Sequence, residues 1–145
     1  MDDVILIARL FLFVREAVSQ NNGQRVNAIQ VWSGGHEALG TSWCAWFVTM
    51  VLDLAYQGNA PILRMGSVQA IRDLCQQKGW TTDTPSVGDL YFYVDANDHG
   101  HHVGIVTNLS PLTGISGNTS ADGLSDNGDR VAEHQITATH FAHYA

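Results

Sequence analysis

The chain has 145 residues, of which 45% are hydrophobic and 14% are charged. This length and composition predict one ordered globular domain, residues 1–145, and argue against a disordered or coiled-coil chain. Seven Lys and Arg stand against 14 Asp and Glu, so the formal net charge is −7, and we expect no nucleic-acid partner because a phosphate backbone would be repelled.

The first segment, residues 3–19, is predicted to be an amphipathic helix, because its apolar residues recur at helical spacing. It begins next to Asp2 and Asp3, and Arg9 interrupts the apolar run. A secretion leader starts with basic residues, and a membrane span needs roughly 20 apolar residues. We therefore expect neither a leader nor membrane insertion.

The middle of the chain predicts helices and its last part predicts strands. Helices are expected at 43–56, with a hydroxyl of Thr41 or Ser42 as N-cap, and at 68–77, with a shorter helical turn within 26–32. Five short strands are expected at residues 90–94, 102–109, 114–117, 130–136 and 140–144. Helices followed by strands predict an α+β domain with an antiparallel sheet.

Cys44 lies in the first turn of the most apolar predicted helix. The unpaired N–H groups and the positive dipole end of a helix favour a thiolate there, which suits a nucleophile. The alternative is a small buried core residue. The other cysteine, Cys75, is predicted to face the core, and without a leader we expect both thiols to be free.

A base for Cys44 is available in the HGHHVGIV stretch, residues 99–106. Strand alternation places His102 and Gly104 on one face, while Val103 and Ile105 face the core. Gly104 would let another element, such as the Cys44 helix, approach closely. An amide that holds the imidazole is available from Asn118.

Four stretches together resemble the CHAP family of amidohydrolases and peptidases, papain-like cysteine enzymes that cut peptidoglycan and abound in phage lysins. They occur in the family's order and cover roughly residues 20–137. They are SWCAWFV at 42–48, PSVGDL at 85–90, HVGIV at 102–106, and GNT at 117–119 followed by Gly123, Gly128 and Val131.

The resemblance implies a papain-like fold and catalytic roles for three residues. Cys44 would be the nucleophile, His102 the general base and acid, and Asn118 the residue that orients His102. The family often reads Glu-Gly-Asn where this chain has Ser116-Gly117-Asn118, so the carboxylate is missing and Ser116 is a possible helper. Candidate substrate-binding residues are Trp43 and His36, with a core tryptophan and an exposed loop histidine as the alternatives.

The implied reaction is acyl transfer through a thioester, with backbone N–H groups at the helix start meeting the oxyanion. No cofactor or metal is expected. The bond would be either the muramoyl–L-alanine amide or one within the stem peptide or cross-bridge. We expect a monomer that is made in the cytoplasm and reaches peptidoglycan after release, as a phage lysin or a secreted effector.

Two rival interpretations stay open. The first is a metal-dependent hydrolase that uses Asp95, Asp98, His99, His101 and His102, although the two adjacent histidines would point to opposite sides of a strand. The second is a non-catalytic cell-wall-binding or phage structural module with the same fold, in which Cys44 would show no enhanced reactivity.

Overall fold

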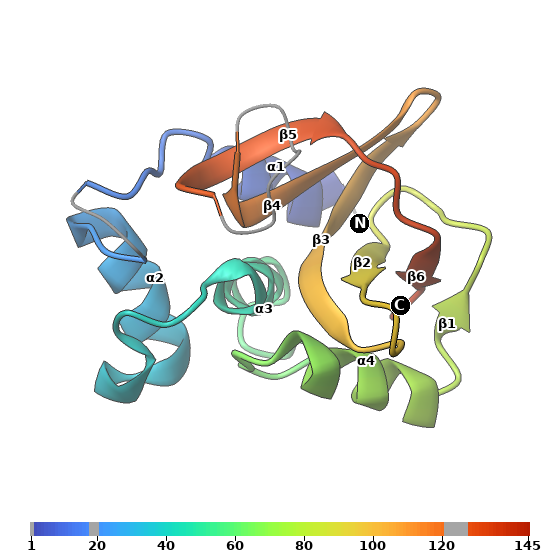
Figure 1. Cartoon of the computed structure of the whole chain (residues 1–145), viewed down its shortest axis with the longest axis horizontal. Helices are drawn as coiled ribbons and strands as arrows, with labels where there is room; N and C mark the ends of the chain where they lie inside the picture. The colour runs from blue at the N-terminus through green and yellow to red at the C-terminus, as the bar shows by residue number, and fades with distance from the viewer. Residues whose placement is uncertain (1, 18–20, 121–127) are drawn as a thin grey trace.

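The computed structural model describes residues 2–17, 21–120 and 128–145. Over these residues, helices precede an antiparallel six-stranded sheet (Figure 1). The helices are α1 (Asp2–Arg9), α2 (Gln24–Gly34), α3 (Cys44–Ala55) and α4 (Val68–Gln77), with the 3-10 helix η1 (His36–Ala38) before α3. The strands are β1 (Thr81–Thr82), β2 (Leu90–Val94), β3 (Gly100–Leu109), β4 (Leu112–Thr119), β5 (Arg130–Gln135) and β6 (His140–Ala142).

The strand order in the sheet is β1-β6-β2-β3-β4-β5. The predicted α+β arrangement, with N-terminal helices on a C-terminal antiparallel sheet, is therefore confirmed. Helix α3 is central, because it packs against β3 and β4 on one side and against α1 and α2 on the other. Most of its side chains are buried, as its apolar sequence predicts.

Both faces of the sheet are covered. Val103 and Ile105 of β3 belong to the main core with α3, as predicted, while His102 and Val106 lie on the other face. A smaller cluster around Tyr91 and Val106 covers that second face. The Tyr91 ring occupies the space where a side chain at Gly104 would lie. Our expectation that Gly104 makes room for the Cys44 helix was therefore wrong.

The N-terminal helix is shorter than the predicted 3–19, for α1 ends at Arg9; residues 18–19 of that prediction lie outside the described residues. After the helix, Val14 accepts a hydrogen bond from the Val131 N–H, and Arg15 forms a β-bridge with Arg130. Pairing with the edge of the sheet thus replaces the helical hydrogen bonds that periodicity predicts. Within the described residues, no helix has the length and apolarity to cross a membrane.

A bidentate ion pair ties α1 to the sheet. Arg9 Nε and Nη2 donate to the two carboxylate oxygens of Glu133, at 3.0 and 2.7 Å. The Arg9 side chain hydrogen-bonds the Glu133 carboxylate and holds its pKa below the usual range. A group whose pKa is depressed by folding stabilises the fold above its ordinary pKa, and this contribution is lost as the pH falls through its folded pKa.

We predict that Glu133→Gln lowers the free energy of unfolding by about 1 kcal/mol or less at pH 7, because both partners are partly exposed. The difference from wild type should shrink below the ordinary Glu pKa of about 4.3. Urea unfolding at pH 7 and at pH 3.5 measures it. A difference that stays constant between the two pH values would contradict an ionic contribution.

Candidate active site

The start of α3 is not capped by a side chain. Trp43 occupies the N-cap position with φ −120° and ψ 11°, and it makes no side-chain capping bond. The predicted cap is wrong because both hydroxyls are engaged elsewhere. The Thr41 hydroxyl donates to the Ala38 carbonyl at 2.6 Å, and Ser42 Oγ accepts from Asn118 Nδ2 at 2.8 Å. Backbone N–H groups of the first turn are thereby left available to an anion.

Cys44 is the first residue of α3 and is only 2% exposed. Burial raises the pKa of its thiol above the ordinary value. Hydrogen bonds from the backbone of Val103 and Ala45, and from the Ser42 side chain, act in the opposite direction. These contacts place the Cys44 sulfur against β3, beside the residue that directly follows His102 in the chain.

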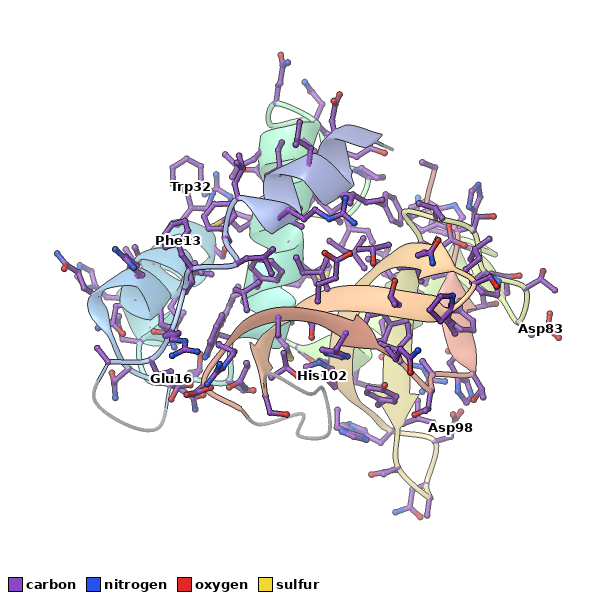
Figure 2. The ribbon with its side chains drawn as sticks, turned by 90° about the horizontal axis from the view of Figure 1, so that it is seen from above. Phe13, Glu16, Trp32, Asp83, Asp98 and His102 are labelled. Carbon is purple, nitrogen blue, oxygen red and sulfur yellow. The ribbon has the colours of Figure 1, made fainter. Side chains whose placement is uncertain are left out.

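His102 is 1% exposed and lies with Tyr91 and Tyr93 on the second face of the sheet, where Figure 2 labels it. Its Nε2 is 3.0 Å from Ser116 Oγ on the neighbouring strand β4. One face of the imidazole stacks on the Tyr93 ring, with centroids 6.0 Å apart and planes at 22°, and Tyr91 packs at 6.3 Å. Ser116 and the two tyrosines therefore define the position of the ring.

Asn118 is fully buried and sits at the register irregularity between β4 and β5. Its side-chain amide nitrogen donates to Ser42, and within the described residues its Oδ1 has no hydrogen-bond partner. The structure thus pairs Ser116 with His102, and Asn118 with Ser42, two positions before Cys44.

The Trp43 ring packs between the start of α3 and strand β4. It is fully buried, and its Nε1 donates to Glu16 Oε1 at 3.0 Å. A Cβ on Gly117 would lie 2.7 Å from this ring and 2.9 Å from the Phe47 Cβ. Only a glycine lets β4 run so close to the start of α3, and this approach brings Asn118 to Ser42.

We predict that Gly117→Ala lowers the free energy of unfolding by roughly 1–3 kcal/mol, because the added methyl group overpacks the contact with Trp43. Chemical denaturation measures the loss. Introducing the same substitution into Trp43→Phe, where the ring is smaller, should cost less. Equal losses in both backgrounds would show that the Trp43 ring is not the obstacle.

The remaining sequence candidates are exposed histidines and the buried Trp43. His36 is exposed in η1, His99 is exposed in the turn before β3, and His101 is exposed within β3. Trp43, a candidate for substrate contact, has no exposed surface. Within residues 2–17, 21–120 and 128–145, no three His, Cys, Asp or Glu side chains are grouped so as to hold a metal ion.

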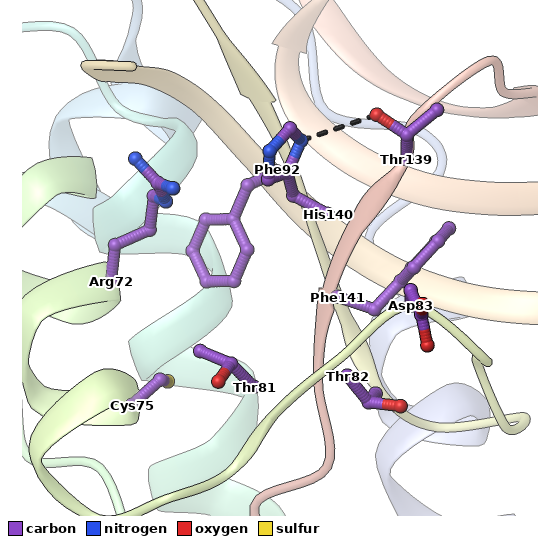
Figure 3. A pocket seen from close by; sticks show the side chains of 9 residues that line it. All are labelled: Arg72, Cys75, Thr81, Thr82, Asp83, Phe92, Thr139, His140 and Phe141. Atoms are coloured by element: carbon purple, nitrogen blue, oxygen red, sulfur yellow. Dashed lines mark hydrogen bonds between the residues drawn. The ribbon is translucent and has the colours of Figure 1, made fainter.

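Cys75 borders a separate hollow of about 420 Å³ between α4 and strands β1, β2 and β6 (Figure 3). Burial raises the pKa of its thiol to about 11. Figure 3 shows the thiol on the α4 side and His140 on the strand side of the hollow. Cys75 is thus a buried core thiol, as predicted from its helix face.

Sequence reasoning missed three contributors: Tyr93, Ser42 and Glu16. Alternation in the LYFYV strand places Tyr91 and Tyr93 on one face, but only the pairing of Tyr93 with His102 reveals what that face touches. Ser42 and Glu16 act through contacts 76 and 27 positions away along the chain, with Asn118 and Trp43 respectively. No local pattern encodes such contacts.

Comparison with known proteins gives one match. The CHAP domain model matches residues 36–118, which run from η1 to the second-last residue of β4 and contain Cys44, His102, Ser116 and Asn118. Gly123, part of the sequence resemblance, lies beyond this match and outside the described residues. Neither the curated proteins nor the solved structures include a match to this chain.

Proposed function

Because the chain belongs to the CHAP family, whose members are cysteine- and histidine-dependent amidases and peptidases acting on peptidoglycan, we propose that it hydrolyses a cell-wall amide bond with Cys44 as nucleophile. The observation that carries this proposal is the seating of the Cys44 sulfur, at the uncapped start of α3, against the strand that bears His102. The target is either the muramoyl–L-alanine amide or a bond of the stem peptide or cross-bridge.

The proposed reaction begins with transfer of the Cys44 thiol proton to His102. The thiolate attacks the carbonyl carbon, and the oxygen anion that forms accepts hydrogen bonds from the N–H groups at the start of α3. The C–N bond then breaks as His102 returns the proton to the leaving amine. Water, deprotonated by His102, hydrolyses the thioester and releases Cys44. These steps use only side chains, backbone and water.

In this proposal His102 is positioned from two directions. Ser116 Oγ meets its Nε2, and the Tyr93 ring fixes the plane of the imidazole. A tyrosine face also stabilises the imidazolium that forms during the reaction, because ring quadrupoles attract cations. This aromatic contact supports His102 together with the hydroxyl of Ser116, which stands at the position where the family often carries a glutamate.

The decisive test is digestion of purified sacculi. Wild type and Cys75→Ser should release soluble fragments, whereas Cys44→Ser should release none above background, because the acyl intermediate forms on Cys44. Mass spectrometry of the products identifies the bond: a stem peptide with a free L-alanine N-terminus marks an amidase, and an internal peptide cut marks an endopeptidase. Equal release by wild type and Cys44→Ser would refute the nucleophile assignment.

One observation favours a second candidate, a non-catalytic wall-binding module. Cys44 is 2% exposed, and burial is the largest influence on the pKa of its thiol and raises it. A thiol in that state, without a base that accepts its proton, is inert. The two functions therefore differ in whether His102 activates Cys44.

We predict that iodoacetamide alkylates Cys44 in the wild type, and that His102→Ala slows this reaction at pH 7 and moves it to higher pH, since the proton acceptor is lost. Mass spectrometry separates modification of Cys44 from modification of Cys75, which serves as the internal control. An alkylation rate that is slow in the wild type and unchanged in His102→Ala would favour the binding module.

A further inference from the structure

Asn118 is held in a way that packing alone does not explain. It is fully buried, its backbone is in the left-handed region at φ 55°, and its Oδ1 has no hydrogen-bond partner within the described residues. A buried carbonyl without a partner costs roughly 1–3 kcal/mol. Such a cost, in a residue placed beside the proposed nucleophile, points to a functional task for the side-chain hydrogen bond that Asn118 does make with the described residues.

That hydrogen bond goes to Ser42. Asn118 Nδ2 donates to Ser42 Oγ at 2.8 Å, between residues 76 positions apart in the sequence. Ser42 is exposed, so its hydroxyl group lies at the outer edge of the site while Asn118 supports it from inside. Because the oxygen of Ser42 accepts from the amide, the hydroxyl hydrogen is directed away from Asn118 and toward another acceptor.

The acceptor beside Ser42 is the sulfur of Cys44. Burial raises the pKa of the Cys44 thiol, while hydrogen bonds to its sulfur from backbone N–H groups on β3 and at the helix start, and from the Ser42 side chain, act in the opposite direction. Ser42 is not used as the helix cap, since α3 has no side-chain capping bond. The Ser42 hydroxyl therefore does not cap the helix, which is the role that its sequence position predicts.

We propose that Ser42 is a further catalytic residue, whose hydroxyl donates a hydrogen bond to the Cys44 thiolate, and that Asn118 is the positioning residue that aims this hydroxyl. The inference rests on the proposed function in taking Cys44 as the nucleophile. It gives Asn118 a role that differs from the expected one, because the amide acts on the thiolate through Ser42 and not on His102.

A donor of this kind acts on the thiolate form of Cys44. The thiolate is buried, so little water reaches it, and each hydrogen bond to a charged group in a dry site counts for more than one at the surface. Removing the Ser42 hydroxyl should therefore move the ionisation of Cys44 to higher pH. Alkylation by iodoacetamide reports this ionisation directly and needs no cell-wall substrate.

The first experiment compares variants in a Cys75→Ala background, in which Cys44 is the single thiol. Ser42→Ala should alkylate roughly ten-fold more slowly at pH 7, with its pH profile displaced upward by roughly one unit. Ser42→Thr, which keeps the hydroxyl, should restore most of the rate. An unchanged pH profile in Ser42→Ala would overturn the proposal.

The second experiment asks whether Asn118 works through Ser42. If it does, Asn118→Ala slows alkylation, and the double variant Ser42→Ala/Asn118→Ala reacts no more slowly than the slower single variant. If Asn118 acts on His102 independently, the two losses multiply in the double variant. Multiplying losses would overturn the positioning role.

Asn118→Asp gives opposite signs for the two roles. The carboxylate would draw the Ser42 hydroxyl hydrogen to itself and place a negative charge near the thiolate, so our proposal expects slower alkylation. A carboxylate that stabilised the His102 imidazolium would instead speed it up, and that result would refute the proposal. Thermal unfolding accompanies each variant, and the exposed Ser42 variants decide the matter if the buried carboxylate of Asn118→Asp prevents folding.

These readouts also separate two kinds of failure. If sacculi are not digested but the Ser42 and Asn118 variants alter Cys44 ionisation as expected, the proposed substrate is wrong. The hydrogen-bond relay, in which Asn118 positions Ser42 and Ser42 donates to Cys44, then stands. If sacculi are digested through Cys44 while Ser42→Ala leaves both alkylation and turnover unchanged, the proposed function stands and the relay is refuted.

Discussion

The contact between the Trp43 ring and the bare backbone of Gly117 is the constraint on which the site depends. It sets how closely β4 approaches the start of α3, and the hydrogen bond from Trp43 to Glu16 fixes the ring in place. Cys44 follows Trp43 directly and Asn118 follows Gly117, so one packing contact determines where both lie. Cys44 and its surroundings are thus positioned by the core, where packing tolerates little displacement.

The second controlling factor is burial. Cys44, His102 and Asn118 are each at most 2% exposed, so charge that develops among them is shielded from water. Burial opposes the thiolate, and only a few N–H groups and the Ser42 hydroxyl favour it. In such a balance each donor carries weight, and the reactivity of Cys44 depends on hydrogen bonds supplied by β3, by the helix start and by Ser42.

Residues outside the reacting group keep the strands in register. Asp89, in the turn before β2, accepts a hydrogen bond from the Ser86 N–H at 2.7 Å and pairs with His143 Nδ1 at 2.6 Å. The C-terminal segment is thereby tied to the strand that carries Tyr91 and Tyr93. Tyr93, on the same strand, stacks on His102. The contact between Asp89 and His143 therefore belongs to the packing around the strand on which the imidazole rests.

Sequence alone determined the α+β class, the central helix and the alternation of β3, because these follow from local periodicity and composition. It also singled out Cys44 and His102, whose residue types and local contexts carry their chemistry. The tertiary structure decided the rest. It ended the first helix early by pairing residues 14–16 with the sheet edge. It also decided that Asn118 hydrogen-bonds to Ser42 and that Ser116 hydrogen-bonds to His102. Those pairings depend on strand register and on the bare backbone at Gly117, which only the packed fold defines.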